Sequence, residues 1–251
     1  MKKLMAANWK MYKTYAEAKA TARALVERLK GTLPAEREVL ILPPFTALRA
    51  VGEEILSASG FLLGGQDLYP AAQGAFTGEI SPLMLKDLGA SFALTGHSER
   101  RHTLGESDAL VGRKTAFGIA SGLGVILCVG EKIEERKAGQ LAAVLTRQLE
   151  AGLADVPEEA AGQRIVIAYE PVWAIGTGLV AGPKEIAEAH AFVRKKLVER
   201  FPDAGRSVRI LYGGSVKPEN SAEIMGLDNV DGVLVGGASL EADSFGRIVL
   251  A

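Results

Sequence analysis

The amino-acid sequence predicts a single α/β domain folded as a (β/α)8 barrel. Eight short runs rich in Val, Ile, Leu and Phe recur along the chain, with stretches of helical character between them. The 251 residues divide into about 31 for each of eight units, enough for one strand, one helix and two loops. The run Ile165–Ala168 is hydrophobic throughout, which is typical of parallel strands covered on both faces. We expect one domain over residues 1–251, with a doubly wound open sheet as the alternative fold.

Each predicted strand is a short apolar run bounded by turn residues. In chain order the runs are Leu4–Ala7, Val39–Leu42, Phe61–Leu63, Phe92–Leu94, Val125–Val129, Ile165–Tyr169, Val208–Tyr212 and Val233–Val235. Three intervening stretches have the composition and apolar spacing of helices, namely Tyr15–Lys30, Ile133–Gly152 and Lys184–Arg200. Glycine and proline mark single turns and no shift in composition divides the chain, so no linker is predicted.

Composition and charge exclude several classes of protein. The 29 basic and 30 acidic residues give a net charge of -1, and no run of five like charges occurs, so nucleic acid is not an expected partner. No apolar stretch approaches the roughly 20 residues of a membrane span, and the first apolar run stops at Asn8, too early for a secretion signal. We therefore expect a cytoplasmic protein. Three histidines without ligand spacing, and Cys128 in an apolar run that fits the core, predict neither a metal site nor a disulfide.

In a parallel barrel the residues that follow the strands converge on one mouth. These positions hold Asn8, Lys10, His97, Glu99, Glu131 and Glu170. Glu170 ends a buried strand, and Pro171 disfavours helical geometry there, so its carboxylate suits a general base. A buried ion pair with lysine or arginine is the structural alternative.

His97 follows a glycine at the predicted start of a helix, where backbone N–H groups disfavour an imidazolium. A neutral imidazole there can polarise a carbonyl, whereas a histidine that only caps the turn is the alternative. Lys10 places a cation in apolar surroundings, where it can offset the charge of a phosphate or enolate; otherwise it is a surface lysine beside Trp9. His190 lies in a helical run and is expected to be solvated.

Two glycine loops predict a phosphate site. Gly213–Ser215 and Gly236–Gly237 follow the seventh and eighth strands, where barrels commonly bind phosphate through backbone N–H groups. Either pair alone is better explained as a tight turn into the next helix, but the occurrence of both after these two strands favours the phosphate site. The segment Pro171–Pro183 predicts a lid that excludes water, and Gly176 within it can offer its N–H group to an anion. Phe76, in the glycine-flanked loop Gly74–Glu79, predicts a subunit anchor or, alternatively, packing on its own barrel.

A base, a neutral electrophile, a cation, a phosphate cradle and a lid suit proton abstraction next to a carbonyl of a small phosphorylated substrate. That chemistry interconverts an aldose and a ketose. Two other functions remain alternatives. One is a Schiff-base aldolase, disfavoured because strands five to seven carry no lysine. The other is a non-catalytic sugar-phosphate-binding barrel, against which the joint presence of Lys10, His97 and Glu170 argues.

Six segments spread along the chain resemble the triosephosphate isomerase family. They are A-N-W-K-M at Ala7–Met11, G-Q-D-L-Y at Gly65–Tyr69, G-H-S-E-R-R at Gly96–Arg101, Y-E-P-V-W-A-I-G-T-G at Tyr169–Gly178, Y-G-G-S-V at Tyr212–Val216 and V-G-G-A-S-L at Val235–Leu240. The resemblance implies a cofactor-independent (β/α)8 enzyme that interconverts dihydroxyacetone phosphate and D-glyceraldehyde 3-phosphate through an enediol, in glycolysis and gluconeogenesis. A glutamate base, a neutral histidine and a closing loop are established features of this family.

The resemblance also implies roles for individual residues. Glu170 would shuttle the proton, His97 would polarise the carbonyls and Lys10 would stabilise negative charge. Asn8 would contact the substrate oxygens, and Glu99 would be a supporting carboxylate. The phosphate would be bound by Gly176, Ser215, Gly236 and Gly237. Thr77 would lie in a loop that reaches a partner's active site, which implies a homodimer or sometimes a tetramer.

Two segments depart from the family pattern. Tyr12 replaces a frequent asparagine, and Leu179–Gly182 replaces K-T-A-T at the second hinge of the lid. Because glycine caps a helix less well than threonine and adds backbone entropy, we expect slower or less cooperative lid closure.

Overall fold

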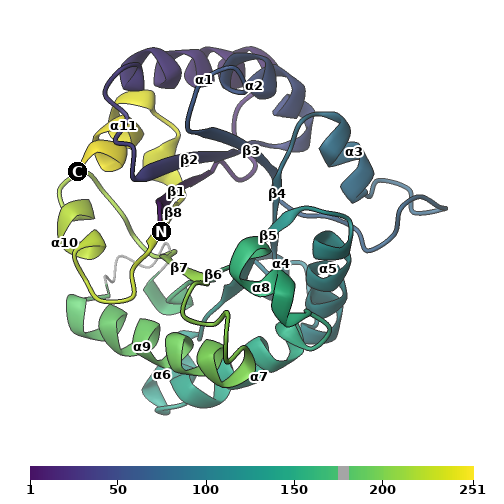
Figure 1. Cartoon of the computed structure of the whole chain (residues 1–251), viewed down its shortest axis with the longest axis vertical. Helices are drawn as coiled ribbons and strands as arrows, with labels where there is room; N and C mark the ends of the chain where they lie inside the picture. Colours follow the sequence, from purple (N-terminus) through teal and green to yellow (C-terminus); the bar gives the residue numbers. More distant parts are fainter. Residues whose placement is uncertain (175–180) are drawn as a thin grey trace.

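The protein is a closed barrel of eight parallel strands within a ring of helices (Figure 1), as described by a computed structural model for residues 1–174 and 181–251. The strands are β1 Lys3–Asn8, β2 Arg37–Leu42, β3 Phe61–Gly65, β4 Phe92–Thr95, β5 Gly124–Val129, β6 Ile165–Tyr169, β7 Arg209–Tyr212 and β8 Gly232–Val235. Each strand pairs with its sequence neighbour, and β1 pairs with both β2 and β8, which closes the sheet. The predicted (β/α)8 barrel is confirmed, and the open sheet is excluded.

The described helices follow the strands around the outside of the barrel. They are α1 Tyr15–Leu29, α2 Leu48–Ile55, α3 Pro82–Asp87, α4 Ser98–His102, α5 Asp108–Ala120, α6 Ile133–Lys137, α7 Leu141–Leu153, α8 Glu158–Arg164, α9 Pro183–Arg200, α10 Ser221–Met225 and α11 Ala242–Leu250. Short 3-10 turns occupy Phe45–Ala47, Val172–Ala174 and Gly237–Ser239. None of the described helices is long and apolar enough to cross a membrane.

The strands are buried on both faces, as their continuous hydrophobicity predicts. Residues such as Leu4, Ile126 and Ala168 form a compact cluster drawn almost entirely from the strands, which we assign to the barrel interior. Alternate residues such as Met5 and Val125 belong to a larger cluster that includes the helices. Cys128 is fully buried in the inner cluster, which confirms its predicted place in the core. This two-layer packing fixes the strand ends that carry the site.

The stretch Ile133–Gly152 is not one helix. Between α6 and α7 the chain passes through Gly139, whose φ of +67° lies in the left-handed region that ends helices. The helical spacing on either side extends across this break, and for that reason the sequence pattern alone did not reveal it.

The prediction that His190 is solvated is wrong. His190 is fully buried on the face of α9 that also carries Ile186 and Val193, at helical spacing. Its ring packs near Tyr169 and Tyr212, with centroids 5.9 and 6.3 Å away. A polar residue on the inward stripe of an amphipathic helix is buried with that stripe when it finds a hydrogen-bond partner.

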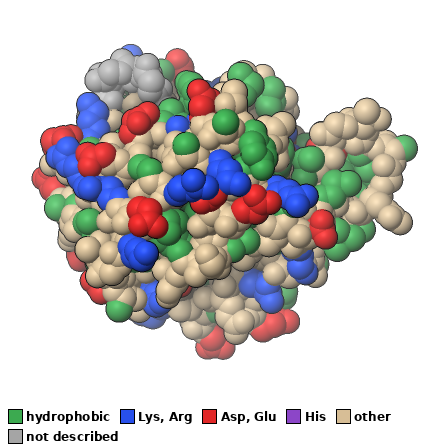
Figure 2. All heavy atoms as spheres, turned by 90° about the horizontal axis from the view of Figure 1, so that it is seen from above, with side chains coloured by type: hydrophobic (Ala, Val, Ile, Leu, Met, Phe, Trp, Pro, Cys, Tyr) green, Lys and Arg blue, Asp and Glu red, His purple; other side chains and the backbone are tan. Residues whose placement is uncertain are grey.

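The segment between β3 and α3 projects beyond the ring of helices (Figures 1 and 2). It contains Phe76 and Thr77, both exposed, and the ring of Phe76 stacks on Tyr69 with a centroid distance of 4.3 Å. Hydrophobic side chains also lie on the surface beside it, with Leu83 and Met84 more than half exposed. Hereafter we call residues 66–81 the projecting loop.

Candidate active site

The glycine that ends β4 turns the chain directly into a short helix. Gly96 has a φ of +67°, which only glycine adopts readily, and His97 then caps the N-terminus of α4. The His97 Nδ1 atom accepts the Glu99 N–H at 3.3 Å, so in the neutral ring the hydrogen is on Nε2. That Nε2 atom lies 3.1 Å from Oε1 of Glu170. The predicted base and the predicted electrophile are therefore neighbours.

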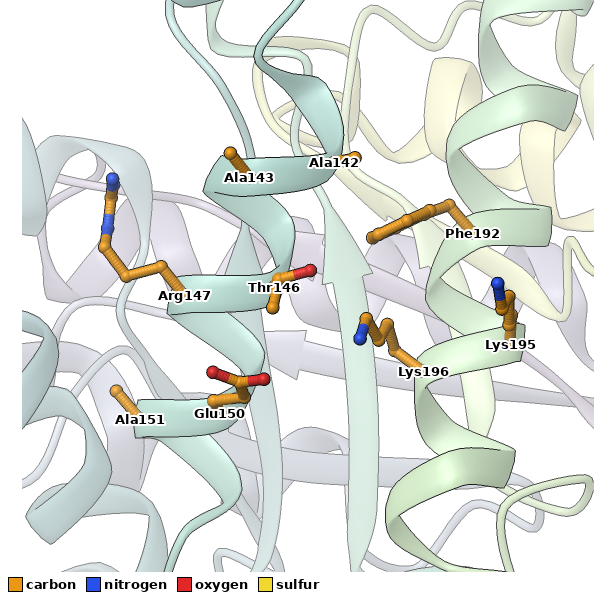
Figure 3. Close-up of a pocket in the computed structure, with 9 residues that line it drawn as sticks. All are labelled: Ala142, Ala143, Thr146, Arg147, Glu150, Ala151, Phe192, Lys195 and Lys196. Carbon is orange, nitrogen blue, oxygen red and sulfur yellow. The ribbon is translucent and has the colours of Figure 1, made fainter.

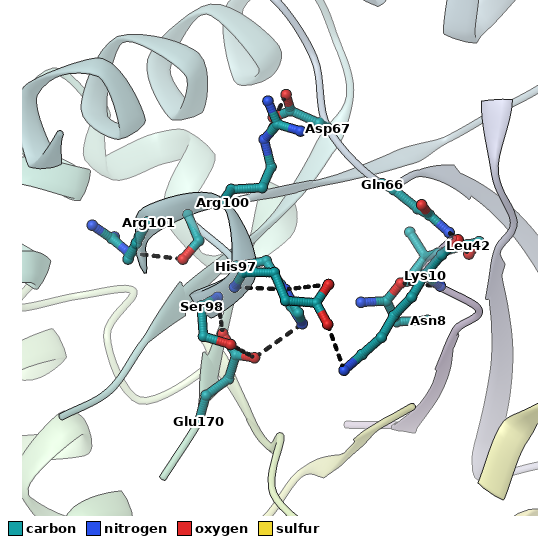
Figure 4. A network of polar contacts seen from close by, with 12 residues as sticks. Asn8, Lys10, Leu42, Gln66, Asp67, His97, Ser98, Arg100, Arg101 and Glu170 are labelled. Carbon is teal, nitrogen blue, oxygen red and sulfur yellow. Dashed lines mark hydrogen bonds and ion pairs between the residues drawn. The ribbon is translucent and has the colours of Figure 1, made fainter. Parts of the chain in front are cut away.

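Glu170 follows β6 directly and is only 2% exposed. Its carboxylate accepts the backbone N–H of Ser98 at 3.0 Å and the Ser98 hydroxyl at 3.1 Å (Figure 4). Among the described residues no lysine or arginine forms an ion pair with it, so the alternative of a structural ion pair finds no support. A buried carboxylate held by hydrogen bonds to exchangeable groups is suited to proton transfer.

Lys10 reaches the same mouth from β1. Its Nζ atom lies 2.9 Å from Oε1 of Glu99, and the other Glu99 oxygen is 3.6 Å from Nδ1 of His97. The expectation that Lys10 lies in apolar surroundings is therefore wrong, because a carboxylate from α4 pairs with its ammonium group. The cation that lies over Trp9 is Lys13, at 5.6 Å from the ring. Glu99 therefore contacts both Lys10 and His97.

The glycine loops border the same space. A Cβ atom on Gly236 would lie 3.3 Å from Cε of Lys10, and one on Gly213 would lie 3.0 Å from Cγ of Glu170. Gly237 has no atom within 4 Å of its Cβ position, so its backbone faces open space at the start of a 3-10 turn. Ser215 is half-buried in the loop after β7. The two loops therefore border the lysine and the glutamate.

Asn8 and Glu131 are buried polar residues at or just after the ends of β1 and β5. Asn8 is 4% exposed, and its side-chain oxygen accepts the backbone N–H of Lys10 at 3.0 Å. Glu131 is fully buried and accepts hydrogen bonds from the Tyr169 hydroxyl at 3.0 Å and the Trp173 indole at 2.8 Å. Burial raises the pKa of the Glu131 carboxyl above its ordinary value. It anchors the start of the segment after β6.

The cluster does not include every predicted position. Gly176 and the hinge residues Leu179 and Val180 fall outside the described residues. Thr77 is exposed on the projecting loop. Within the described part of the chain no group of three or more His, Cys, Asp or Glu side chains is arranged to hold a metal ion.

Sequence reasoning assigned no role to two residues that contact the site. Ser98 lies inside the motif Gly96–Arg101, yet only the fold shows that it donates two hydrogen bonds to Glu170. Gln66 lies inside Gly65–Tyr69 and donates from Nε2 to the Lys10 carbonyl at 2.8 Å. Their places in these motifs were the only signal available.

A groove on the outer surface lies between α7 and α9 (Figure 3). Phe192 projects from α9 toward the small residues of α7, among them Ala142 and Thr146. None of the predicted site residues lines this groove. The site is therefore assigned to the mouth of the barrel.

A family model described as triosephosphate isomerase matches residues 3–251. The chain belongs to the triosephosphate isomerase family. A triosephosphate isomerase from Nitratidesulfovibrio vulgaris (strain Miyazaki F) is 66% identical over 251 residues, with both chains fully covered. One from Oleidesulfovibrio alaskensis is 61% identical, again over the full length of both. The predicted family is confirmed.

A solved structure of this family is similar to the chain in both fold and sequence. The crystal structure of triosephosphate isomerase from Bartonella henselae has a TM-score of 0.87 and 42% identity, covering 99% of this chain and 98% of its own. The match to this solved barrel therefore covers nearly the whole chain, and the site described above lies at the mouth of the barrel.

Proposed function

We propose that the protein interconverts dihydroxyacetone phosphate and D-glyceraldehyde 3-phosphate through an enediolate. The observation that carries this proposal is the contact between Nε2 of His97 and Oε1 of Glu170 at 3.1 Å. A proton acceptor and a neutral hydrogen-bond donor side by side are what proton transfer next to a carbonyl requires. Membership of the triosephosphate isomerase family supports the choice of substrate.

Glu170 acts as the base. Its carboxylate takes a proton from the carbon next to the carbonyl, and the electron pair of that C–H bond forms the carbon–carbon double bond of the enediolate. The carbonyl π electrons move onto the carbonyl oxygen, which takes the proton of the neighbouring hydroxyl group. The carboxylate then returns its proton to the former carbonyl carbon, and the neighbouring oxygen, now without its proton, becomes the new carbonyl oxygen. To act, Glu170 exchanges its hydrogen bonds with Ser98 and His97 for contact with the substrate.

His97 and Lys10 stabilise the charge that develops on oxygen. Because Nδ1 of His97 accepts the Glu99 N–H, the Nε2–H group is free to donate to the substrate oxygen once it leaves Glu170. The Lys10 side chain is 23% exposed, and its ammonium group pairs with Glu99 at the mouth. It offsets the negative charge of the enediolate and the phosphate, and Asn8 contributes to binding the substrate oxygens.

The glycine loops after β7 and β8 bind the phosphate. Gly236 and Gly237 expose backbone N–H groups beside Lys10, and Ser215 lies in the neighbouring loop. Gly176 completes this cradle when the segment after Pro171 closes over the substrate. A dianion held there places its carbonyl end between Lys10 and Glu170.

The functional assembly is a homodimer in the cytoplasm, serving glycolysis and gluconeogenesis. The projecting loop offers exposed Phe76 and Thr77 to a second copy, with Leu83 and Met84 beside them as further apolar surface. Static light scattering tests the assembly against the chain mass of 26.5 kDa. A mass of one chain at micromolar concentration would contradict the dimer, and four chains would indicate a tetramer.

The activity is tested by a coupled assay that starts from D-glyceraldehyde 3-phosphate and consumes dihydroxyacetone phosphate as it forms. We expect rapid turnover by the wild-type protein. Binding of either triose phosphate without turnover would support a non-catalytic sugar-phosphate-binding barrel instead. A covalent adduct trapped by borohydride in the presence of substrate would support a Schiff-base aldolase.

A further inference from the structure

The backbone of Lys10 is strained. Its φ of +51° lies in the left-handed region, which non-glycine residues avoid at a cost of about 1 kcal/mol or more. Such a conformation persists only where the surroundings hold it in place. Lys10 carries the cation of the proposed site, so whatever holds this peptide also sets the position of that cation.

Two side chains hold the backbone of Lys10, one through its N–H group and the other through its C=O group. The oxygen of Asn8 accepts its N–H at 3.0 Å, and Nε2 of Gln66 donates to its C=O at 2.8 Å (Figure 4). The same Gln66 nitrogen donates to the Leu42 carbonyl at 2.9 Å, which ties it to the end of β2. The carboxamide thus bridges two carbonyl oxygens, which a carboxylate or an apolar side chain of the same size cannot do.

Gln66 is the first residue of the projecting loop. The next residue, Asp67, is buried and binds Nζ of Lys114 at 2.6 Å and Nε of Arg100 at 2.9 Å. Arg100 belongs to α4, the helix that presents Ser98 to Glu170. Gln66 and Asp67, at the base of the loop, therefore contact the Lys10 backbone and helix α4 respectively.

We propose that Gln66 is a positioning residue that holds Lys10 in its left-handed conformation and so sets the place of the ammonium group. This inference rests on the proposed isomerase function. Because Gln66 is the first residue of the projecting loop, its hydrogen bond also couples the position of that loop to the position of Lys10. Gln66 does not touch the substrate; it acts through the Lys10 peptide.

The experiment compares Gln66→Met, which keeps the length but removes both donated hydrogen bonds, with Gln163→Met as a control. Gln163 is exposed on α8, which precedes β6 and so lies at the far end of the barrel from the mouth. We expect Gln66→Met to lower kcat/KM by about 10- to 100-fold, since misplacement of a catalytic group by an ångström has effects of this size. The control keeps wild-type kcat/KM. Light scattering must show the same mass for all three proteins.

A double-mutant cycle with Lys10→Ala separates positioning from a general structural effect. In the Lys10→Ala background we expect Gln66→Met to cause no further loss, because no ammonium group remains to be placed. An equal loss in both backgrounds would overturn the proposal, as would a loss that disappears when raised protein concentration restores the assembly. Wild-type kcat/KM in Gln66→Met would overturn it as well.

A second variant covers the case in which Gln66→Met does not fold. Gln66→Glu keeps the shape but faces two carbonyls with a carboxylate, which donates a hydrogen bond only when protonated. Its kcat/KM relative to wild type should therefore recover as the pH falls from 8 to 5. A pH-independent ratio would contradict the proposal. If the wild-type protein turns over neither triose phosphate, the proposed function fails first, and the two failures are thereby distinguished.

Discussion

His190 is a buried group whose protonation we expect to destabilise the folded protein in acid. Its Nδ1–H donates to the carbonyl of Asn229 at 2.8 Å, and its Nε2 atom has no hydrogen-bond partner among the described residues. Burial lowers the pKa of the imidazole from its usual 6.5 to about 4. Protonation would place a second N–H and a positive charge between Tyr169 and Tyr212.

The sign and the size follow from proton linkage. Between pH 4 and 6.5 the unfolded chain binds a proton at His190 that the folded protein does not, so the free energy of unfolding rises with pH across this window. With pKa values of about 4 and 6.5, the loss between pH 7 and pH 5 is about 2 kcal/mol, and the full effect is about 3 kcal/mol. Above pH 7 this contribution is constant.

The assay is urea unfolding at fixed protein concentration from pH 4.5 to 7.5, for wild type and His190→Asn. The amide nitrogen of asparagine replaces Nδ1 as the donor to Asn229 but does not titrate, so the variant is less stable at neutral pH yet lacks this pH dependence. Burial also raises the pKa of Asp67 to about 6, which acts in the opposite direction and cancels in the comparison. Exposed Gln163, changed to asparagine, is the control, because neither side chain titrates. Equal pH slopes for wild type and His190→Asn would refute the reasoning.

Three further substitutions test separate parts of the structure. Gly130→Ala would place a Cβ atom 1.7 Å from the Glu170 carbonyl oxygen, so we expect kcat to fall by about 100-fold or more; Gly226→Ala, whose nearest contacts are at 3.4 Å, should stay within about twofold of wild type. Phe76→Asp should reduce the mass seen by light scattering from two chains to one, and an unchanged mass would count against the loop as a subunit anchor. Gly182 caps α9 without a side-chain hydrogen bond, so Gly182→Thr should speed lid closure in relaxation dispersion; ordinary microsecond-to-millisecond closure that this change leaves unaltered would contradict the hinge prediction.

The barrel and most of the site were predictable because the information is local in the sequence. Apolar runs bounded by turns gave all eight strands to within two residues at either end. Residues at strand ends such as Lys10, His97 and Glu170 converge at the mouth in any closed parallel barrel, so their meeting requires no knowledge of side-chain contacts. The family resemblance then supplied roles for them.

What the sequence did not predict depends on side-chain direction and on contacts between distant segments. His190 was misplaced because its polar side chain was taken as a sign of exposure, although Ile186 and Val193 at helical spacing place it on the apolar face of the helix. Gln66 reaches a carbonyl 56 positions away, and Ser98 reaches a carboxylate 72 positions away. The left-handed backbone conformation of Lys10 could not be predicted, because lysine does not favour that conformation. Such contacts are set by the register and tilt of strands that are far apart in the chain.

The central claim, that Glu170 moves the proton, is tested most directly by comparing turnover of D-glyceraldehyde 3-phosphate by wild type and Glu170→Gln. The substitution keeps the shape of the side chain and removes the base. We predict that kcat falls by about 10²- to 10⁴-fold, the usual contribution of a positioned general base, while inorganic phosphate still binds with wild-type affinity. Turnover by Glu170→Gln within about tenfold of wild type would contradict the account, because the loss of a general base should lower kcat by more than that.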